Sequence, residues 1–335
     1  MRIAVVGTGK VATENYLPWL AEQPDVQLAY LNRTPRRAKA AAESFGGTVF
    51  TAASELIAWR PDVALVLTNE MWHHEAGLPL VEAGVPRVLF EKPLVAAKGQ
   101  AHVDESDFAK GKELLSLASR SGTEVAMMFN YRFFDQTLTA RRIAKERGFG
   151  KVTSVTGLVH YACWSHCIDL IHHFVGAVET VTALEGAPVR EGQGISARDI
   201  VVACTFENGA TGTLVGTAGL KWQHPLFELT FNFEGGRLHM RDIDGDLEIL
   251  DGAGRTHERL SIVRDTSRWQ HYSASFHKAL SAYFDAVRSG SPAPVSGLDG
   301  LRELQFEAAI RRAIAENRPV RLAREFPLPV SNSSR

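Results

Sequence analysis

The sequence predicts an α/β protein of two domains: an N-terminal doubly wound parallel sheet and a C-terminal α+β domain with a mostly antiparallel open sheet. Three observations support this prediction. A β-branched run at 2–6 leads directly into a glycine-containing turn and a helix. Apolar strands then alternate with helical segments as far as residue 130, as in parallel sheets covered on both faces. From residue 151 the strands alternate β-branched with polar residues, and Asn-Gly at 208–209 is a strong hairpin signal.

The expected boundaries of the elements follow from these patterns. In the first domain we expect strands at 2–6, 27–31, 49–50, 63–68, 87–90 and 125–130, and helices at 11–22, 35–45, 53–59, 75–83 and 106–119. In the second we expect strands at 152–159, 178–184, 200–206, 211–215, 226–233, 236–240 and 246–250, then helices at 269–288 and 298–316. The domains are accordingly placed at 1–125 and 126–297, with a disordered tail at 326–335.

Composition excludes several classes of partner. The chain has 335 residues with 45% hydrophobic content, enough for two cores. Its 37 basic and 38 acidic residues leave a net charge of -1, so no electrostatic basis exists for binding nucleic acid or an anionic membrane. No apolar run approaches the ~20 residues of a membrane helix, and a strand begins too early for a signal peptide. The 3 cysteines argue against a disulfide framework, and we expect a cytoplasmic protein.

The first turn has the pattern of a dinucleotide-binding, or Rossmann, domain. Gly7-Thr-Gly-Lys-Val-Ala12 reads G-x-G-x-x-A between a strand and a helix. Gly7 permits the tight turn, Gly9 lets the backbone approach a pyrophosphate, and Ala12 allows close packing of helix on strand. The phosphates are then expected at the helix N-terminus. The predicted contacts are with Gly7, Thr8, Gly9, Lys10 and Val11.

The end of the second strand indicates which dinucleotide is bound. NAD-preferring sites usually carry an acidic residue here for the ribose 2′-hydroxyl, and this chain has none. Asn32 can bond a hydroxyl, whereas Arg33, Thr34 and Arg37 suit a 2′-phosphate. The alternative is a solvated basic first turn of the following helix. We expect NADP to be preferred, with NAD possible.

The run Val88–Leu94 places Glu91-Lys92-Pro93 at the carboxyl end of a buried strand, the edge of an open α/β sheet where ligands bind. A lone lysine there is often a solvated charge that ends the strand. Lys92 is alternatively a general acid/base, because lysine shifts its pKa readily when desolvated. The dinucleotide turn in the same domain favours the second interpretation.

Together these motifs resemble the glucose–fructose oxidoreductase / inositol dehydrogenase (Gfo/Idh/MocA) family. The G-x-G-x-x-A turn is accompanied by Thr68-x-x-x-x-His73, where the family usually reads Thr-Pro-Asn-x-x-His. Glu-Ala-Gly at 82–84 precedes Glu-Lys-Pro at 91–93, and Asn-Tyr-Arg-Phe at 130–133 matches the family's Asn-x-Arg-Phe. The resemblance spans nearly the whole chain.

The resemblance implies an NAD(P)-dependent oxidoreductase that moves a hydride between nicotinamide and a hydroxyl or keto carbon of a sugar, cyclitol or sugar-like substrate. Lys92 would lie between nicotinamide and substrate, with Glu91 and Pro93 shaping the corner, sometimes through a cis peptide. Thr68 and His73 would lie on the cofactor side. The helix at 298–316 would pack back onto the first domain, and the chain would form a homodimer or homotetramer through its open sheet face.

Residues 160–173 hold the second half of the expected site. The family carries Asp-x-Gly-x-His-x-x-Asp here, and His166 and Asp169 match the last two members. Ala162 and Trp164 stand where the first Asp and the Gly belong. His166 would then relay protons beside Lys92 and orient the hydroxyl, and Asp169 would fix it or bond a neighbouring hydroxyl, with Tyr131 and Tyr161 as candidates to assist.

Other interpretations of this segment stay open. Cys163, His166 and Cys167 have helical ligand spacing, but without a paired motif or carboxylate we expect no metal. The same residues also fit an amphipathic core helix. Trp164 either stacks on a sugar or aglycone face or only packs, and Arg132 pairs either with a substrate phosphate or carboxylate or with a structural acid.

Two other functions remain alternatives at this point. The first is a glycoside-cleaving or eliminating enzyme with a recycled NAD, which the missing carboxylate at Ala162 would fit. The second is a non-catalytic NADP-sensing binding protein, which would need neither Lys92 nor His166.

Overall fold

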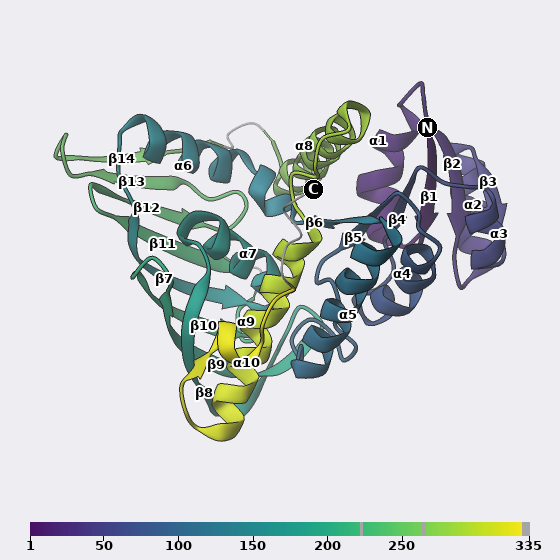
Figure 1. Ribbon diagram of the computed structural model, residues 1–335. Coiled ribbons are helices and arrows are strands. Elements are labelled where there is room, and N and C mark those ends of the chain that lie inside the picture. The colour runs from purple at the N-terminus through teal and green to yellow at the C-terminus, as the bar shows by residue number, and fades with distance from the viewer. Residues whose placement is uncertain (222–223, 263–265, 330–335) are drawn as a thin grey trace.

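The computed structural model describes residues 1–221, 224–262 and 266–329. Its first half forms a 6-stranded parallel sheet with the order β3-β2-β1-β4-β5-β6 (Figure 1). The strands are β1 (Arg2–Val6), β2 (Gln27–Leu31), β3 (Thr48–Phe50), β4 (Val63–Val66), β5 (Arg87–Glu91) and β6 (Glu124–Met128). The order reverses between β1 and β4, which confirms the predicted doubly wound sheet and puts a ligand crevice at their carboxyl ends.

Helical segments connect these strands. They are η1 (Ala12–Tyr16), α1 (Leu17–Ala21), α2 (Pro35–Phe45), α3 (Ala53–Ala58), η2 (Glu70–Trp72), α4 (His73–Glu82) and α5 (Glu105–Ser121). The helix expected at 11–22 is not uniform: η1 is a turn of π-helix, with the Leu17 amide donating to the Ala12 carbonyl. Pro18 follows immediately and has no amide hydrogen for an α-helical bond, so the change of winding falls just before it.

The second half forms a 9-stranded sheet with the order β14-β13-β12-β11-β7-β10-β9-β8-β15. In the described part of the chain β7 and β10 pair in parallel and the other neighbours are antiparallel, as expected for a mostly antiparallel sheet. The strands are β7 (Val152–His160), β8 (Val178–Gly192), β9 (Ile195–Phe206), β10 (Thr211–Thr217), β11 (Phe227–Phe233), β12 (Gly236–Arg241), β13 (Leu247–Asp251), β14 (Thr256–Leu260) and β15 (Val320–Arg321). The predicted Asn208-Gly209 hairpin joins β9 to β10.

Strands β8 and β9 are longer than predicted. Their extra residues pair as a two-stranded ribbon from Val189–Gly192 to Ile195–Arg198. Much of this ribbon is exposed. Its two strands are therefore held together by hydrogen bonds and not by packing on the core. Because the prediction followed apolar alternation, it ended where the core contact ends. Strand β14 was not predicted for the same reason, because it is exposed and polar and has no apolar alternation.

The remaining helices are η3 (Asn130–Phe133), α6 (Asp135–Glu146), η4 (Tyr161–Cys163), α7 (Trp164–Val175), α8 (Arg268–Ser289), α9 (Gly297–Glu316) and α10 (Leu322–Glu325). Helix α8 packs on the first sheet, where Phe276, Leu280 and Phe284 share a core with Ile3 and Tyr16. It lies beside α1 in Figure 1. None of the helices in the described ranges is long and apolar enough to cross a membrane.

Helix α9 runs between the two sheets (Figure 1). Its first turn has no room for side chains against β6: a Cβ on Gly297 would lie 2.7 Å from Val125, and one on Gly300 would lie 2.7 Å from Met127. Helix α9 thus packs closely on β6 of the first sheet. The predicted tail begins too early, because Phe326 is buried and its carbonyl accepts a bond of 2.7 Å from Gln305. Residues 330–335 of that tail lie outside the described residues.

Candidate active site

The glycine turn has the geometry of a phosphate cradle. Gly7 has φ +99°, and a Cβ there would lie 2.7 Å from the backbone of Leu67 and Thr68, so only glycine fits. A Cβ on Gly9 would meet nothing within 4 Å, which leaves its backbone open to a ligand. Lys10 and Val11 are exposed beside it. The turn therefore fits a dinucleotide pyrophosphate at the start of a helix.

The end of β2 is organised by Asn32. Its amide nitrogen donates to the Thr8 hydroxyl at 2.7 Å, and its oxygen accepts from the Thr34 amide at 3.0 Å. Arg33 is exposed, with its guanidinium 4.5 Å from the centre of the Trp72 ring. Arg37 is also exposed, so cationic groups border this edge of the cradle. Asn32 thus shapes the loop through protein contacts.

Residues Glu91–Pro93, here called the lysine corner, are hydrogen-bonded to a residue of η1. The Lys92–Pro93 peptide is cis. One carboxylate oxygen of Glu91 accepts from the Tyr16 hydroxyl, and the other accepts from the Lys92 amide at 3.0 Å. Burial raises the pKa of Glu91. Hydrogen bonds from Tyr16 and from the Lys92 amide use both of its carboxylate oxygens. Tyr16 lies 75 residues away in sequence, and nothing in the motifs indicated this contact.

His73 braces the other side of the lysine corner. Its Nδ1 lies 2.7 Å from the Pro93 carbonyl and its Nε2 lies 3.1 Å from the Thr68 carbonyl. Burial lowers the pKa of His73, so the ring is neutral and its proton serves one of these two oxygens. Both nitrogens therefore contact the protein. The Thr68 hydroxyl, in contrast, has no partner among the described residues.

Lys92 bridges the two domains. Its Nζ donates to Gln100 Oε1 at 2.8 Å and to the Ala162 carbonyl at 3.4 Å. The Ala162 amide in turn donates to His160 Nδ1 at 3.0 Å, which fixes the turn that presents this carbonyl. Gln100 and His160 were missed from sequence, since Gln100 lies in a polar loop without a motif and His160 ends a strand. A backbone oxygen thus faces Lys92 where the family pattern has a carboxylate.

His166 lies in α7 as a buried, neutral imidazole. Burial, and then the charge of Lys92, lowers the pKa of His166 well below its ordinary value. The ring stacks on Tyr131 with 4.0 Å between centres and 4° between planes. The Tyr131 hydroxyl lies 3.3 Å from Cys163 Sγ. Nδ1 of His166 has no hydrogen-bond partner among the described residues.

Asp169 forms a buried ion pair with Arg132. The guanidinium contacts the two carboxylate oxygens at 2.8 and 2.5 Å and reaches Asp299 of α9 at 3.1 Å. Burial raises the pKa of Asp169 to about 6, although Arg132 acts to lower it. Of the two interpretations of Arg132, the geometry matches a structural acid. The pair ties η3, α7 and α9 together.

Tyr161 and Trp164 are also engaged inside the protein. The Tyr161 hydroxyl donates to the Arg198 carbonyl at 2.7 Å, and its ring meets Trp164 edge-on at 5.7 Å. Trp164 is 2% exposed and lies so close to Gly216 that a Cβ there would be 3.1 Å from the indole. The indole therefore packs between α7 and β10.

Within the described chain, no group of three His, Cys, Asp or Glu side chains is arranged to hold a metal ion.

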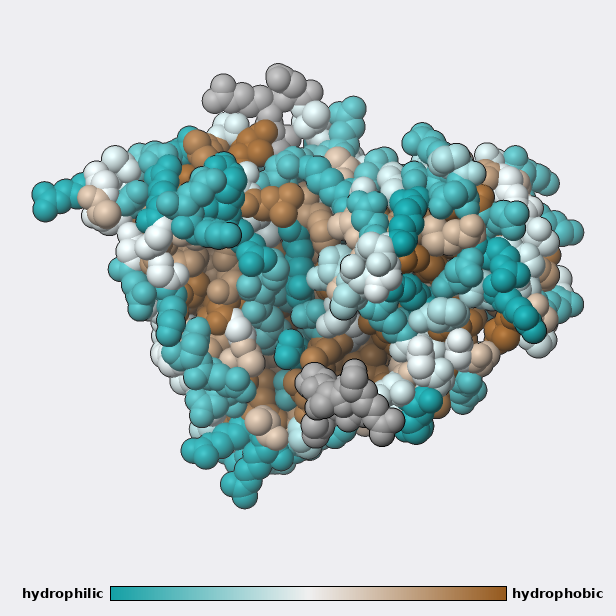
Figure 2. All heavy atoms as spheres, turned by 45° about the horizontal axis from the view of Figure 1, so that its top comes forward, coloured by the Kyte–Doolittle hydropathy of each residue, from teal (hydrophilic) through white to brown (hydrophobic). Residues whose placement is uncertain are grey.

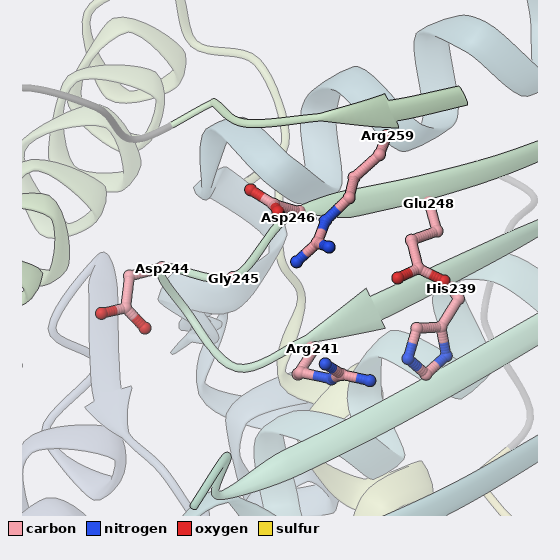
Figure 3. A pocket seen from close by; sticks show the side chains of 7 residues that line it. All are labelled: His239, Arg241, Asp244, Gly245, Asp246, Glu248 and Arg259. Carbon is pink, nitrogen blue, oxygen red and sulfur yellow. Dashed lines mark hydrogen bonds and ion pairs between the residues drawn. The ribbon is translucent and has the colours of Figure 1, made fainter. Parts of the chain in front are cut away.

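A separate pocket of about 200 Å³ lies on β12, β13 and β14 (Figure 3). Its lining is charged, and an ion pair joins Arg259 to Asp246 across it. Lys92 and His166 do not line it. On the face shown in Figure 2, hydrophilic residues cover most of the outer surface, and hydrophobic residues show in its hollows. We therefore place the candidate site at the lysine corner, where the glycine turn, Lys92 and His166 converge.

A dinucleotide cradle beside an amine at the carboxyl edge of a doubly wound sheet is the arrangement of a nicotinamide-dependent oxidoreductase. Residues 1–129 match the oxidoreductase family with an NAD-binding Rossmann fold, and residues 150–322 match the C-terminal α/β domain of the same family. The chain belongs to the Gfo/Idh/MocA oxidoreductase family and is an NAD(P)-dependent dehydrogenase.

Individual relatives agree with this assignment. Myo-inositol dehydrogenase Hyg17 of Streptomyces leeuwenhoekii is 26% identical over 320 residues, covering 89% of this chain and 91% of that protein. D-glucoside 3-dehydrogenase of Escherichia coli K12 is 26% identical over 166 residues, covering 49% of this chain and 44% of that protein. The structure of a levoglucosan dehydrogenase with NADH and levoglucosan is similar in fold, with a TM-score of 0.79, 17% identity and coverage of 96% and 99%.

Proposed function

We propose that this protein is an NADP(H)-preferring dehydrogenase that interconverts a hydroxyl and a keto group on a sugar, cyclitol or sugar-like substrate. The observation that carries the proposal is the position of Lys92 Nζ, held by Gln100 and the Ala162 carbonyl at the carboxyl edge of the sheet. The activities named for the relatives, on myo-inositol, a glucoside and levoglucosan, support this substrate class.

Lys92 is the proposed acid/base. When bound, the nicotinamide ring supplies or accepts the hydride. An ammonium has three donors, and two of the Lys92 donors are used by Gln100 and Ala162, which leaves one for a substrate oxygen. Lys92 would give its proton to a carbonyl oxygen during reduction and receive it during oxidation.

Residues of the second domain would assist in different ways. Neutral His166 would exchange a proton with the substrate hydroxyl, since its Nδ1 lacks a protein partner in the described chain. Tyr131 would orient that ring by stacking on it. Asp169 would act as a positioning residue that holds α7 through Arg132. Tyr161 and Trp164 would shape the wall behind them.

Lys92→Ala tests this mechanism. The variant should bind NADPH with unchanged affinity, measured by nicotinamide fluorescence, and lose roughly 10²–10⁴-fold in kcat. Myo-inositol, methyl β-D-glucoside and levoglucosan serve as substrates for the assay, with Lys98→Ala, an exposed neighbour, as the matched control. Near-normal turnover by Lys92→Ala would contradict the mechanism, and absence of NADPH and NADH binding by the wild type would contradict the proposed function.

The preference for NADP rests on the charge around the cradle. Arg33, Thr34 and Arg37 are exposed beside it, and Asn32 occupies the position usual for an acid. Arg33 would contact the 2′-phosphate from its place on Trp72. Arg33→Ala should weaken NADPH binding about tenfold, or 1.4 kcal/mol, and leave NADH binding unchanged. Equal weakening of both cofactors would contradict the preference.

One observation favours a second reaction on the same fold. Ala162 replaces the family's carboxylate, and a glycoside-cleaving or eliminating enzyme with a recycled NAD would fit that change. A cofactor that co-purifies and is not consumed during turnover would support this alternative. A non-catalytic NADP sensor is disfavoured because it would need neither Lys92 nor a neutral His166.

We also propose a cytoplasmic homodimer or homotetramer that pairs through the open face of the second sheet. Leu184, Val201, Val215 and Leu158 are direct cross-strand neighbours on β8, β9, β10 and β7 and form an apolar row. Leu184 is 68% exposed and Val201 is 46% exposed. Leu184→Glu should dissociate the oligomer in light scattering, and a monomeric wild type would contradict the proposal.

A further inference from the structure

The loop at residues 98–104, which follows the lysine corner, carries one of the two groups that hold Lys92. We call it the glutamine loop. Gly99 has φ +88°, and its carbonyl accepts a hydrogen bond of 2.9 Å from the His102 amide. Gln100 is therefore the first of two central residues in a tight turn. Its side-chain oxygen lies 2.8 Å from Lys92 Nζ, so the position of this turn decides where the amine is held.

Arg311 of α9 holds the backbone of the glutamine loop. Ala101 is 3% exposed and Val103 is 0% exposed, and carbonyls of buried residues need hydrogen-bond donors. Arg311 supplies both: its Nη2 donates to the Ala101 carbonyl at 2.6 Å, and its Nε donates to the Val103 carbonyl at 3.3 Å. The guanidinium presents these donors in one rigid plane. One side chain thus fixes the backbone directly after Gln100.

Arg311 also begins a second series of contacts, which leads to the other partner of Lys92. Its Nη1 lies 3.4 Å from one oxygen of Glu185, and the second oxygen of Glu185 pairs with Arg198 at 3.2 Å. The Arg198 carbonyl accepts from the Tyr161 hydroxyl at 2.7 Å. Tyr161 directly precedes Ala162, whose carbonyl accepts from Lys92 at 3.4 Å. The contacts therefore form a closed circuit that begins and ends at the amine.

The two paths from Arg311 to Lys92 differ in strength. The short path crosses two buried carbonyls and reaches Gln100 within one residue. The long path depends on two ion pairs, and the Arg198 side chain in it is 52% exposed. Exposed ion pairs hold side chains weakly, because water and salt screen them. We therefore expect Arg311 to act on Lys92 mainly through Gln100.

The outer side of the glutamine loop is held by polar contacts and not by packing. A cavity of about 350 Å³ separates the loop from the ribbon of β8 and β9. Across it, His102 Nε2 lies 3.1 Å from the Ser196 carbonyl. Because side chains do not fill this space, the bonds from His102 and Arg311 carry the connection. The cavity lining includes Ala101, His102, Val189, Ala197 and Arg311.

We infer that Arg311 is a positioning residue, which holds the glutamine loop so that Gln100 directs the Lys92 ammonium toward the substrate oxygen. This inference rests on the proposed dehydrogenase activity. A lysine ammonium rotates on a flexible four-carbon stem, and two fixed acceptors leave its third donor with one direction. Orientation of a reacting group lowers the barrier of the chemical step, so the loss of Arg311 should slow that step.

Single-turnover kinetics test the role of Arg311. With myo-inositol or methyl β-D-glucoside at saturation, Arg311→Met should slow reduction of the bound nicotinamide at least about tenfold and leave NADPH affinity unchanged. Arg318→Met is the matched control, because Arg318 also donates to a backbone carbonyl, that of Pro319 at 3.0 Å, and pairs with Glu325. Its rate should equal that of the wild type. A normal rate in Arg311→Met would overturn the inference.

A double-mutant cycle tests the path. Gln100→Ala should slow the same step at least about tenfold, and Arg311→Met combined with Gln100→Ala should be no slower than Gln100→Ala alone. Effects that multiply to about a hundredfold would overturn the path through Gln100. Arg311→Lys carries the same test if Arg311→Met does not fold, since lysine keeps the charge but lacks the planar fork for two carbonyls.

Hydrogen exchange tests the loop without substrate. The His102 amide is protected by its bond to Gly99, and it should exchange at least about tenfold faster in Arg311→Met than in the wild type or Arg318→Met. Unchanged exchange would overturn the inference, because Arg311 would then not hold the loop. Failure of the wild type to bind NADPH or NADH would overturn the proposed function, whereas a normal single-turnover rate in Arg311→Met would overturn this inference alone.

Discussion

The lysine corner and the region where α7 and α9 are in contact, here called the seam, differ in how far their buried polar groups are hydrogen-bonded. In the corner, both oxygens of Glu91 accept hydrogen bonds, and neutral His73 donates its one ring proton to one of the two carbonyl oxygens beside it. In the seam, His166 Nδ1 has no hydrogen-bond partner among the described residues, and the oxygens of Glu303 have none there except the neighbouring Glu307 carboxyl. A fully satisfied network is rigid, whereas groups with unused hydrogen-bonding capacity can change protonation. The comparison indicates that hydrogen bonds hold the corner around Lys92 in one arrangement, whereas the seam keeps buried polar groups whose protonation can change with pH.

The Arg132 ion pair joins α7 to α9 across the seam, and breaking it should have the largest effect. Arg132→Met would leave the buried Asp169 carboxylate without a cation, beside Asp299, which keeps its pair with Arg302 at 3.9 Å. We expect a loss of about 3–5 kcal/mol in the free energy of unfolding, measured by urea denaturation. Arg142→Met removes an exposed pair with Glu146 and should cost no more than about 0.5 kcal/mol. Similar small losses in both variants would show that the Arg132 pair does not anchor the seam.

The carboxyl groups of the seam should make stability depend on pH. Because the pKa of Glu307 is about 7 in the folded protein, above its unfolded value, the folded state binds more protons between about pH 4.5 and 7. Stability should therefore fall as pH rises through this window, by about 3 kcal/mol from Glu307. Asp169, with a pKa of about 6, acts in the same direction.

Glu307→Gln isolates this contribution. Urea midpoints at about pH 5 and pH 8 should differ less in the variant than in the wild type, because the amide does not titrate. Glu316→Gln should retain the wild-type difference, since that carboxylate is exposed. Equal pH dependence in the wild type and in Glu307→Gln would mean that Glu307 is ionised throughout and that the contrast between corner and seam fails.

The corner should respond to the loss of its brace by a smaller amount. His73→Phe removes the contacts with the Pro93 and Thr68 carbonyls and should cost about 1–3 kcal/mol, measured by thermal or urea unfolding. His74→Phe is the matched control, because the His74 Nε2 is buried without a partner in the described chain and its loss should be nearly neutral. Equal effects at both positions would indicate that packing, and not hydrogen bonding, holds the corner.

Sequence reasoning was strongest where function depends on neighbours along the chain. The turn at Gly7 and Gly9, the Glu91–Pro93 corner and the Asn208-Gly209 hairpin are local, and the structure has each of them where predicted. The extents of β8 and β9 were wrong, because their outer ribbon is held by hydrogen bonds that leave no apolar pattern. The tail was placed too early, because one buried side chain, Phe326, carries no periodic signal.

The sequence by itself determined the doubly wound sheet, the dinucleotide cradle and the lysine at its edge, because each depends on a few adjacent residues with restricted backbone conformations. Only the tertiary structure decided which polar groups meet: Tyr16 with Glu91, Gln100 with Lys92, and Asp299 with Arg132. In the sequence Glu303 and Glu307 look like ordinary solvated helix residues. Burial of α9 between the two sheets removes their solvent, and desolvation depends on the surrounding fold, which no local pattern contains.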